Sequence, residues 1–172
     1  MTHPMIDPGY HPVRRDQLRP EKNHDSYRHS QKPAEPTVCP ECGAMFHAGR
    51  WQWGVAPEEA SKLVCPACLR IHDDFPAGFV FIGGQFFTEH RDEILRLLEH
   101  HAQKEAAEHP LARIMAIKDL DSSENPRLLI TTTDIHLARD LGEALNNAYR
   151  GELEFHYNEA ENLLRVHWSR GL

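Results

Sequence analysis

This sequence lacks long apolar runs and a positive net charge, and it has few cysteines. No segment of the 172 residues approaches the roughly 18 to 20 consecutive apolar residues of a membrane-spanning helix, so we expect a cytoplasmic protein without membrane association. The formal net charge is −7, which argues against a protein that coats nucleic acid with its whole surface. There is no export signal, and only four cysteines are present, which argues against a secreted protein built on disulfides.

The four cysteines fall into two short pairs. They lie in Cys39–Cys42 (CPEC) and Cys65–Cys68 (CPAC), with 22 residues between the pairs. Each pair can present two thiolates to one point, and four thiolates are the usual tetrahedral shell of a structural Zn²⁺. Gly43 follows the first pair and can adopt a positive φ, which would let its amide donate to a sulfur. The sequence therefore predicts one structural zinc ion, held in a zinc ribbon by the thiolates of Cys39, Cys42, Cys65 and Cys68.

Two other uses of the cysteine pairs are less consistent with the sequence. A thioredoxin-like redox site needs a single pair at the start of a helix in a βαβ unit, and disulfides need an exported protein. A zinc site closed by four thiolates has no open position for water. We therefore expect the metal to stabilise structure and to take no part in catalysis.

The first 36 residues differ in composition from the rest. They contain six basic and five acidic residues and six of the twelve prolines, whereas the remainder carries 13 basic and 21 acidic residues. Such a segment cannot bury enough apolar surface to offset its chain entropy, so we predict a disordered, basic and proline-rich arm over residues 1–36. Its cations suit contact with RNA phosphates, and a passive tail is the alternative.

Residues 37–76 are predicted to form the zinc ribbon. Trp51 and Trp53 alternate with polar residues, so in a strand both indoles would lie on one side. These rings are either the small core of the ribbon or a stacking surface for bases. The segment that starts at Pro57 has the proline and the carboxylates of a helix start.

Residues 77–170 alternate between strand and helix patterns. Strands are predicted over residues 79–82, 111–120, 127–133, 153–157 and 164–168. A helical apolar stripe contains Phe87, Ile94, Leu97, Leu98 and His101. A second helix is predicted from the N-cap Asp134 to Gly151, with Ala138, Leu141, Leu145 and Ala148 in line. The order strand, helix, strand, strand, helix, strand, strand predicts a ferredoxin-like α+β sandwich with one added edge strand.

Several of these segments resemble one family. They are residues 65–70 (CPACLR), the helix around Leu97 and Leu98, residues 109–114 (HPLARI) and residues 128–138 (LLITTTDIHLA). Between Cys39 and Trp168 the chain resembles the zinc-containing N-terminal half of the nonsense-mediated decay protein three family, the export adaptor of the large ribosomal subunit in archaea and eukaryotes. The resemblance implies zinc ligation by the four cysteines and docking on the large subunit near its joining face.

Two features depart from that family. Eukaryotic members have two zinc sites, whereas this chain has cysteines for one, and the later β-rich domains and export signals do not fit in 172 residues. The chain looks like a small bacterial relative of the N-terminal half. Contact with a ribosome or with RNA is then expected, and nuclear export is not.

We do not expect an enzyme. The sequence has thirteen histidines, and His136, His156 and His167 could converge, but no nucleophile or open metal site can be named beside them. The pair of glycines at positions 83 and 84 lacks the spacing of a phosphate-binding loop.

Two non-enzymatic functions remain. The first is a zinc factor that associates with the large ribosomal subunit or its rRNA, in assembly, quality control or a stress-induced resting state. The second is a protein-interaction adaptor, in which the acidic sandwich binds a basic protein and the zinc is purely structural. Only RNA binding should weaken steeply with salt and require the arm. The candidate RNA contacts are Arg14, Arg15, Arg19, Lys22, Arg28, Lys32, Arg50, Trp51, Trp53, Arg70 and Arg139.

Overall fold

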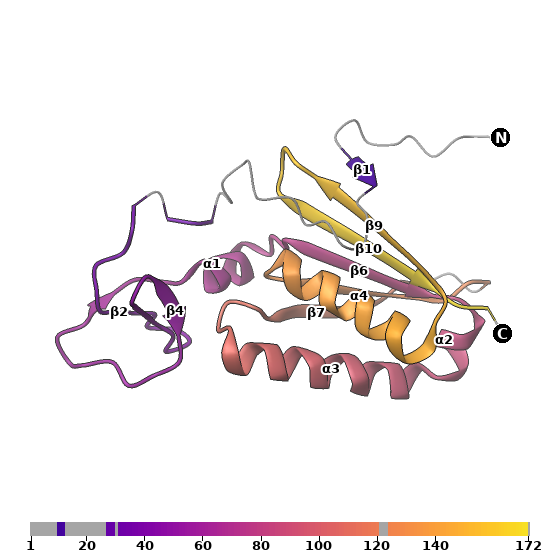
Figure 1. The fold of residues 1–172 in the computed structure, drawn as a ribbon, viewed down its shortest axis with the longest axis horizontal. Helices are drawn as coiled ribbons and strands as arrows, with labels where there is room; N and C mark the ends of the chain where they lie inside the picture. The colour runs from indigo at the N-terminus through magenta and orange to yellow at the C-terminus, as the bar shows by residue number, and fades with distance from the viewer. Residues whose placement is uncertain (1–9, 13–26, 30, 121–123, 172) are drawn as a thin grey trace.

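The alternating apolar residues of the second half of the chain form most of a six-stranded sheet (Figure 1). The computed structural model describes residues 10–12, 27–29, 31–120 and 124–171. The strand order is β1-β9-β10-β6-β8-β7, and both parallel and antiparallel pairs occur. The strands are β1 (Tyr10–Pro12), β6 (Gly78–Gly83), β7 (Ile114–Leu120), β8 (Arg127–Thr132), β9 (Glu152–Asn158) and β10 (Leu163–Ser169). The predicted α+β class is confirmed.

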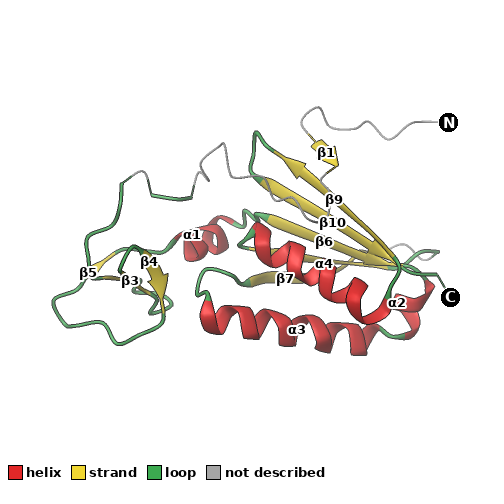
Figure 2. Cartoon of the chain, viewed as in Figure 1, coloured by secondary structure: helices red, strands yellow, loops and turns green. Residues whose placement is uncertain are grey.

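Helices cover one face of this sheet (Figure 2). They are α2 (Gln85–Glu89), α3 (Arg91–Glu108) and α4 (Ile135–Tyr149). Val80 and Ile82 of β6 are fully buried in one core with Ile94 of α3 and Leu141 of α4. Among the described residues, no helix is both long and apolar enough to cross a bilayer.

Both predicted helical stretches form helices, with two differences. The first stretch breaks at His90, so Phe87 and the rest of its stripe lie on separate helices. Asp134 caps α4 as predicted, because its carboxylate accepts a hydrogen bond from the Leu137 amide at 3.1 Å. Ala148 is exposed, contrary to the prediction, and Tyr149 packs against the core in its place. At about 100° per residue, Tyr149 lies about 20° from Ala138 around the helix axis, whereas Ala148 lies about 80° away.

The predicted ferredoxin-like strand order is not found. In a ferredoxin-like sheet, the strand after the second helix, here β9, would pair with the first strand, β6. The added strand, β10, would then lie at the edge. Instead, β10 pairs with β6 in parallel and with β9 on its other side. β10 buries Leu163, Leu164, Val166 and Trp168, whereas β9 buries only Phe155 and Asn158. The more apolar strand of the terminal hairpin therefore takes the interior position.

A second, four-stranded sheet lies beside one end of the large sheet, in the order β4-β3-β2-β5 (Figure 1). Its elements are β2 (Thr37–Val38), β3 (Met45–His47), β4 (Arg50–Gln52) and β5 (Ser61–Lys62), and α1 (Pro66–Asp73) follows.

The predicted helix start at Pro57 is wrong. The Ala60 amide donates to the Pro57 carbonyl at 3.0 Å in a single turn, because the next two residues pair with β2. We call residues 32–76 the metal module.

Parts of the segment predicted as a disordered arm instead have defined contacts. β1 pairs with β9, whose outer edge presents backbone groups for pairing. Tyr27 stacks on Phe75 with 5.8 Å between ring centroids and donates its hydroxyl hydrogen to Asp73 at 2.9 Å. The Glu35 carboxylate accepts from the Gly49 amide at 2.9 Å, so the metal module begins before residue 37.

Candidate metal centre and open sheet face

The four cysteines come together as the sequence predicts. Their sulfur atoms all lie within 4.8 Å of one another. The Sγ atoms of Cys39 and Cys68 are 3.8 Å apart, as are those of Cys42 and Cys65. A tetrahedral site with Zn–S bonds of about 2.3 Å has sulfurs about 3.8 Å apart, whereas a disulfide needs about 2.0 Å. The four thiol ligands and the distances between their sulfurs therefore match a tetrahedral metal-binding site and not a pair of disulfides.

The first cysteine pair is held by a tight turn after β2. The Cys39 amide donates to the Ala44 carbonyl at 2.8 Å, and the Gly43 amide donates to the Cys39 carbonyl at 2.9 Å. Gly43 has a φ of 80°, as predicted, which a residue with a Cβ rarely adopts. The predicted bond from the Gly43 amide to a sulfur is not found, because this amide closes the turn instead.

The second pair opens α1 and is not a second turn of the same kind. Cys65 is the N-cap residue, and its sulfur accepts from the Cys68 amide at 3.4 Å. Pro66 occupies the first helical position, where its missing N–H costs nothing. The positive end of the helix dipole favours thiolates at this place.

Arg113 joins the cysteine cluster from the large sheet, and the sequence did not reveal it. Its guanidinium donates to the sulfurs of Cys65 and Cys68 at 3.3 and 3.4 Å. The Arg113 amide donates to the Thr133 hydroxyl at 2.9 Å, which anchors the residue at the end of β8. Arg113 lies 45 residues or more from these cysteines in sequence, so no spacing motif could point to it.

The four thiols of the cluster differ in how readily they ionise. Burial raises the pKa of Cys65 and of Cys68. Burial also opposes ionisation of Cys39, but backbone N–H groups of Cys65, Cys42 and Glu41 outweigh it and lower its pKa to about 7. Burial alone would lower the pKa of Arg113, yet the adjacent thiolates raise it. Because thiolates repel one another, a divalent cation would relieve the cost of ionising all four.

We expect that Arg113→Ala weakens metal binding about 10- to 100-fold, the usual effect of losing a group that orients ligands. The thiolates of Cys65 and Cys68 would lose their hydrogen-bonded cation. Competition with a chromophoric chelator measures the affinity. Arg50→Ala, at an exposed position of β4 in the same module, is the control and should leave the affinity unchanged. Equal metal affinity in the two variants would show that Arg113 does not support the site.

The structure separates the candidate RNA contacts into three groups. Arg14, Arg15, Arg19 and Lys22 lie outside the described residues. Arg28, Lys32 and Arg50 are exposed, and Lys32 pairs with Glu35 at 3.2 Å. Trp51, Trp53, Arg70 and Arg139 are engaged in contacts within the fold.

These four engaged residues support the fold through different contacts. Trp51 packs against the cysteine cluster. Trp53 is 43% exposed, and its indole donates to the Ala106 carbonyl of α3 at 2.6 Å. Arg70 is 2% exposed, with its guanidinium 4.4 Å from the Tyr27 ring centroid. Arg139 pairs with Glu143 at 3.3 Å.

A second candidate site is the face of the large sheet opposite the helices, which we call the open face. Val80 and Ile82 point into the core, so the alternate residues Phe79 and Phe81 point the other way. The strand registers place further side chains on the same face. The open face comprises Phe79, Phe81, Lys118, Arg127, Leu129, Glu152, Glu154, His156, Arg165 and His167.

Aromatic rings at the centre of the open face contact one another and a guanidinium. Phe81 and His167 stack with centroids 4.7 Å apart and planes 7° from parallel. The Arg165 guanidinium lies over the Phe79 ring at 5.2 Å. His156 approaches His167 edge-on at 5.6 Å, so these two predicted neighbours do converge, whereas His136 is exposed on α4. Burial and, to a smaller extent, the nearby His156 lower the pKa of His167, which favours its neutral form.

Comparison of the chain with protein-family models, with curated proteins and with solved structures found no match. The resemblance to the nonsense-mediated decay protein three family therefore stays a prediction. A functional assignment depends on the metal centre and the open face themselves.

Proposed function

We propose that this protein is a non-enzymatic, zinc-binding factor that binds single-stranded RNA on its open face. The metal we assign is Zn²⁺, because four clustered thiolates at tetrahedral spacing select a soft ion of that geometry over Mg²⁺ or Ca²⁺. With four sulfur ligands the ion has no position left for water or substrate. Its role is to hold the metal module together and, through Arg113, against the large sheet.

The observation that carries the proposal is the pair of phenylalanines on β6. Phe79 and Phe81 lie on an interior strand, on a face that no helix of the described residues covers. Aromatic side chains on such a sheet face bind single-stranded RNA in other folds by stacking on unpaired bases. Arg165 lies over one face of the Phe79 ring and His167 over one face of the Phe81 ring, so a base would stack on the other face of either ring.

The charge of the open face agrees with an RNA ligand. It carries three permanent cations, Lys118, Arg127 and Arg165, against the two carboxylates of Glu152 and Glu154, in a chain with a net charge of −7. An acidic protein can bind RNA where its cations are concentrated and repel it elsewhere. The basic residues of the first 36 would add interactions with phosphates. The large ribosomal subunit as the source of the RNA rests on the sequence resemblance alone.

We expect Phe79→Ala and Phe81→Ala each to weaken binding of a fluorescently labelled single-stranded RNA by about 1 to 3 kcal/mol, the value of one stacked base. Fluorescence anisotropy at several salt concentrations measures the affinity. Phe75→Ala removes a ring that is 44% exposed but lies outside the open face, so it is the matched control. Melting temperatures of all three variants show whether each one is folded.

Unchanged affinity in both open-face variants, with the RNA still bound, would move the interface elsewhere. If the wild-type protein binds no RNA at low salt, the adaptor function replaces this proposal. Sedimentation of a lysate then tests the target separately, since only a ribosomal factor should travel with the large subunit. Replacing Arg14, Arg15 and Arg19 together with alanine should reduce the salt slope by about 0.7 for each phosphate that is no longer neutralised.

A further inference from the structure

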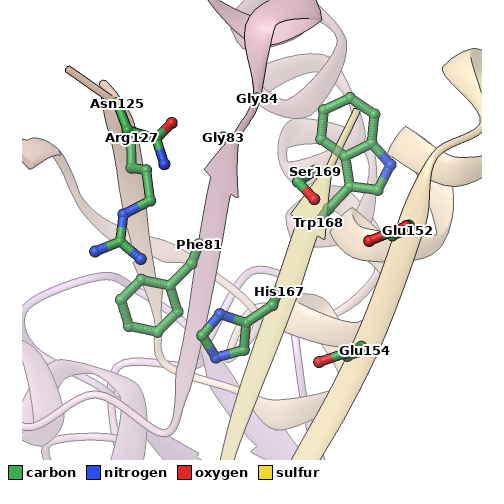
Figure 3. A pocket seen from close by; sticks show the side chains of 10 residues that line it. All are labelled: Phe81, Gly83, Gly84, Asn125, Arg127, Glu152, Glu154, His167, Trp168 and Ser169. Atoms are coloured by element: carbon green, nitrogen blue, oxygen red, sulfur yellow. The ribbon is translucent and has the colours of Figure 1, made fainter. Parts of the chain in front are cut away.

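One end of the open face is hollowed into a pocket of about 220 Å³ (Figure 3). Gly83 of β6 and Ser169 of β10 are cross-strand partners and form its floor. Arg127 rises on one side, from β8, and Glu152 and Glu154 rise on the opposite side, from β9. The stacked rings of Phe81 and His167 close the end toward the centre of the face.

Gly83 in the floor makes room for the Arg127 side chain that lines the pocket. A Cβ atom on Gly83 would lie 3.0 Å from Cγ of Arg127, so glycine allows the arginine stem to cross the end of β6. Sites for drug-sized ligands have volumes of about 300 to 1,000 Å³. The smaller volume here, next to a ring pair, fits a single heterocyclic base.

The two side walls have opposite charge and are not paired with each other. Within the described part of the chain, Arg127 and Glu152 form neither a hydrogen bond nor an ion pair, although Glu154 lies 3.5 Å from His156. A ligand for this pocket must therefore present hydrogen-bond acceptors toward Arg127 and donors toward the carboxylates. It must also be flat enough to lie against the rings.

Guanine meets these requirements most fully among the four bases. Its O6 and N7 accept a bidentate pair of hydrogen bonds from an arginine. Its N1–H and N2 amino group, on the adjoining edge, can donate together to one carboxylate. Adenine would turn its N1 lone pair toward the carboxylate and its amino group toward Arg127. Cytosine and uracil do not combine two neighbouring acceptors on one edge with two neighbouring donor groups on another.

We infer, on the basis of the proposed RNA-binding function, that this pocket binds a guanine base of single-stranded RNA. Arg127 reads the O6 and N7 edge, and Glu152 or Glu154 reads the N1 and N2 edge. Phe79 and Arg165, further along the face, hold the neighbouring nucleotides without reading their sequence, because stacking and charge do not distinguish bases.

The test uses the full chain and three labelled RNA octamers: uridine only, the same with one central guanosine, and the same with one central adenosine. We expect the guanosine octamer to bind about 10-fold more tightly than the adenosine octamer. Glu152→Gln combined with Glu154→Gln should reduce this ratio to about one and leave binding of the uridine octamer intact or stronger. Glu58→Gln with Glu59→Gln, two exposed carboxylates of the metal module, is the matched control and should keep the ratio.

The outcomes separate this inference from the function on which it rests. If all octamers bind with equal affinity, or if the Glu152 and Glu154 variant keeps the preference for guanosine, the pocket does not read guanine, and RNA binding itself stands. If no octamer binds the wild-type protein, both the proposed function and the guanine site are overturned. A preference for guanosine that disappears in the Glu152 and Glu154 variant, but not in the Glu58 and Glu59 variant, supports the inference.

Discussion

Replacing Cys65 with serine is expected to abolish metal binding and unfold the metal module. Cys65 is fully buried, caps α1 and contacts Arg113, so its sulfur links the helix to the large sheet and would also hold the ion. Zinc ligation in small modules supplies on the order of 10 kcal/mol of apparent folding free energy. The module has a small core that consists largely of the cysteines themselves, so little remains to stabilise it without the metal. The large sheet keeps its separate core and should remain folded.

Metal analysis of reduced, freshly purified protein should give one zinc per wild-type chain and none in Cys65→Ser. Fluorescence of Trp51 and Trp53, both in the metal module, should shift toward that of solvent-exposed indole. Treatment of the wild-type protein with a strong chelator should reproduce both changes, and Ser61→Ala, at an exposed position of β5, should cause neither. Clearly less than one zinc in the wild-type chain would rule out a zinc centre.

Leu141→Asp should unfold the large sheet, and Leu145→Asp should do the same. Both leucines are fully buried on the side of α4 that packs against the sheet. Either change places a carboxylate among apolar side chains without a partner, a cost of several kcal/mol that exceeds the effect of most single substitutions. Since small domains are stable by only about 5 to 15 kcal/mol, we expect little folded protein at 37 °C.

Arg139→Ala on the same helix is the matched control for these two variants. Arg139 is in an i,i+4 pair with Glu143 at 3.3 Å, and such pairs contribute about 0.3 to 0.5 kcal/mol. Thermal unfolding followed by circular dichroism compares the three proteins. Similar melting temperatures for all of them would contradict the orientation of α4.

The long helices α3 and α4 and the two cysteine pairs could be predicted because their signals are local. The cap at Asp134 and the stripe through Leu141 depend on residues within a few turns of one another, and the structure has both. The cysteine pairs each need only a turn or a helix start to bring two sulfurs together. What such local patterns leave open is the partner of each strand, and there the ferredoxin-like prediction was wrong.

The open face was not anticipated for a related reason. The run from Phe79 to Ile82 is apolar at every position and was predicted as a strand without an assignment of its two faces. A continuous apolar run carries no period of two, so it does not show which residues point to the helices. Phe79 and Phe81 became visible as a surface only once Val80 and Ile82 were placed in the core.

Arg70 and Arg113 show the same division between local and tertiary information. Arg70 follows the second cysteine pair and was interpreted as an RNA contact, but the structure buries it against Tyr27, more than forty positions earlier. No sequence motif pointed to Arg113, yet its guanidinium contacts two of the four cysteines. The two cysteine pairs, the two long helices α3 and α4 and the α+β class were determined by the sequence itself, because each follows from patterns of residues close together in the chain. The strand order, the open face with its pocket and the arginine at the metal centre were decided by the tertiary structure, because burial and hydrogen bonding depend on which distant segments meet.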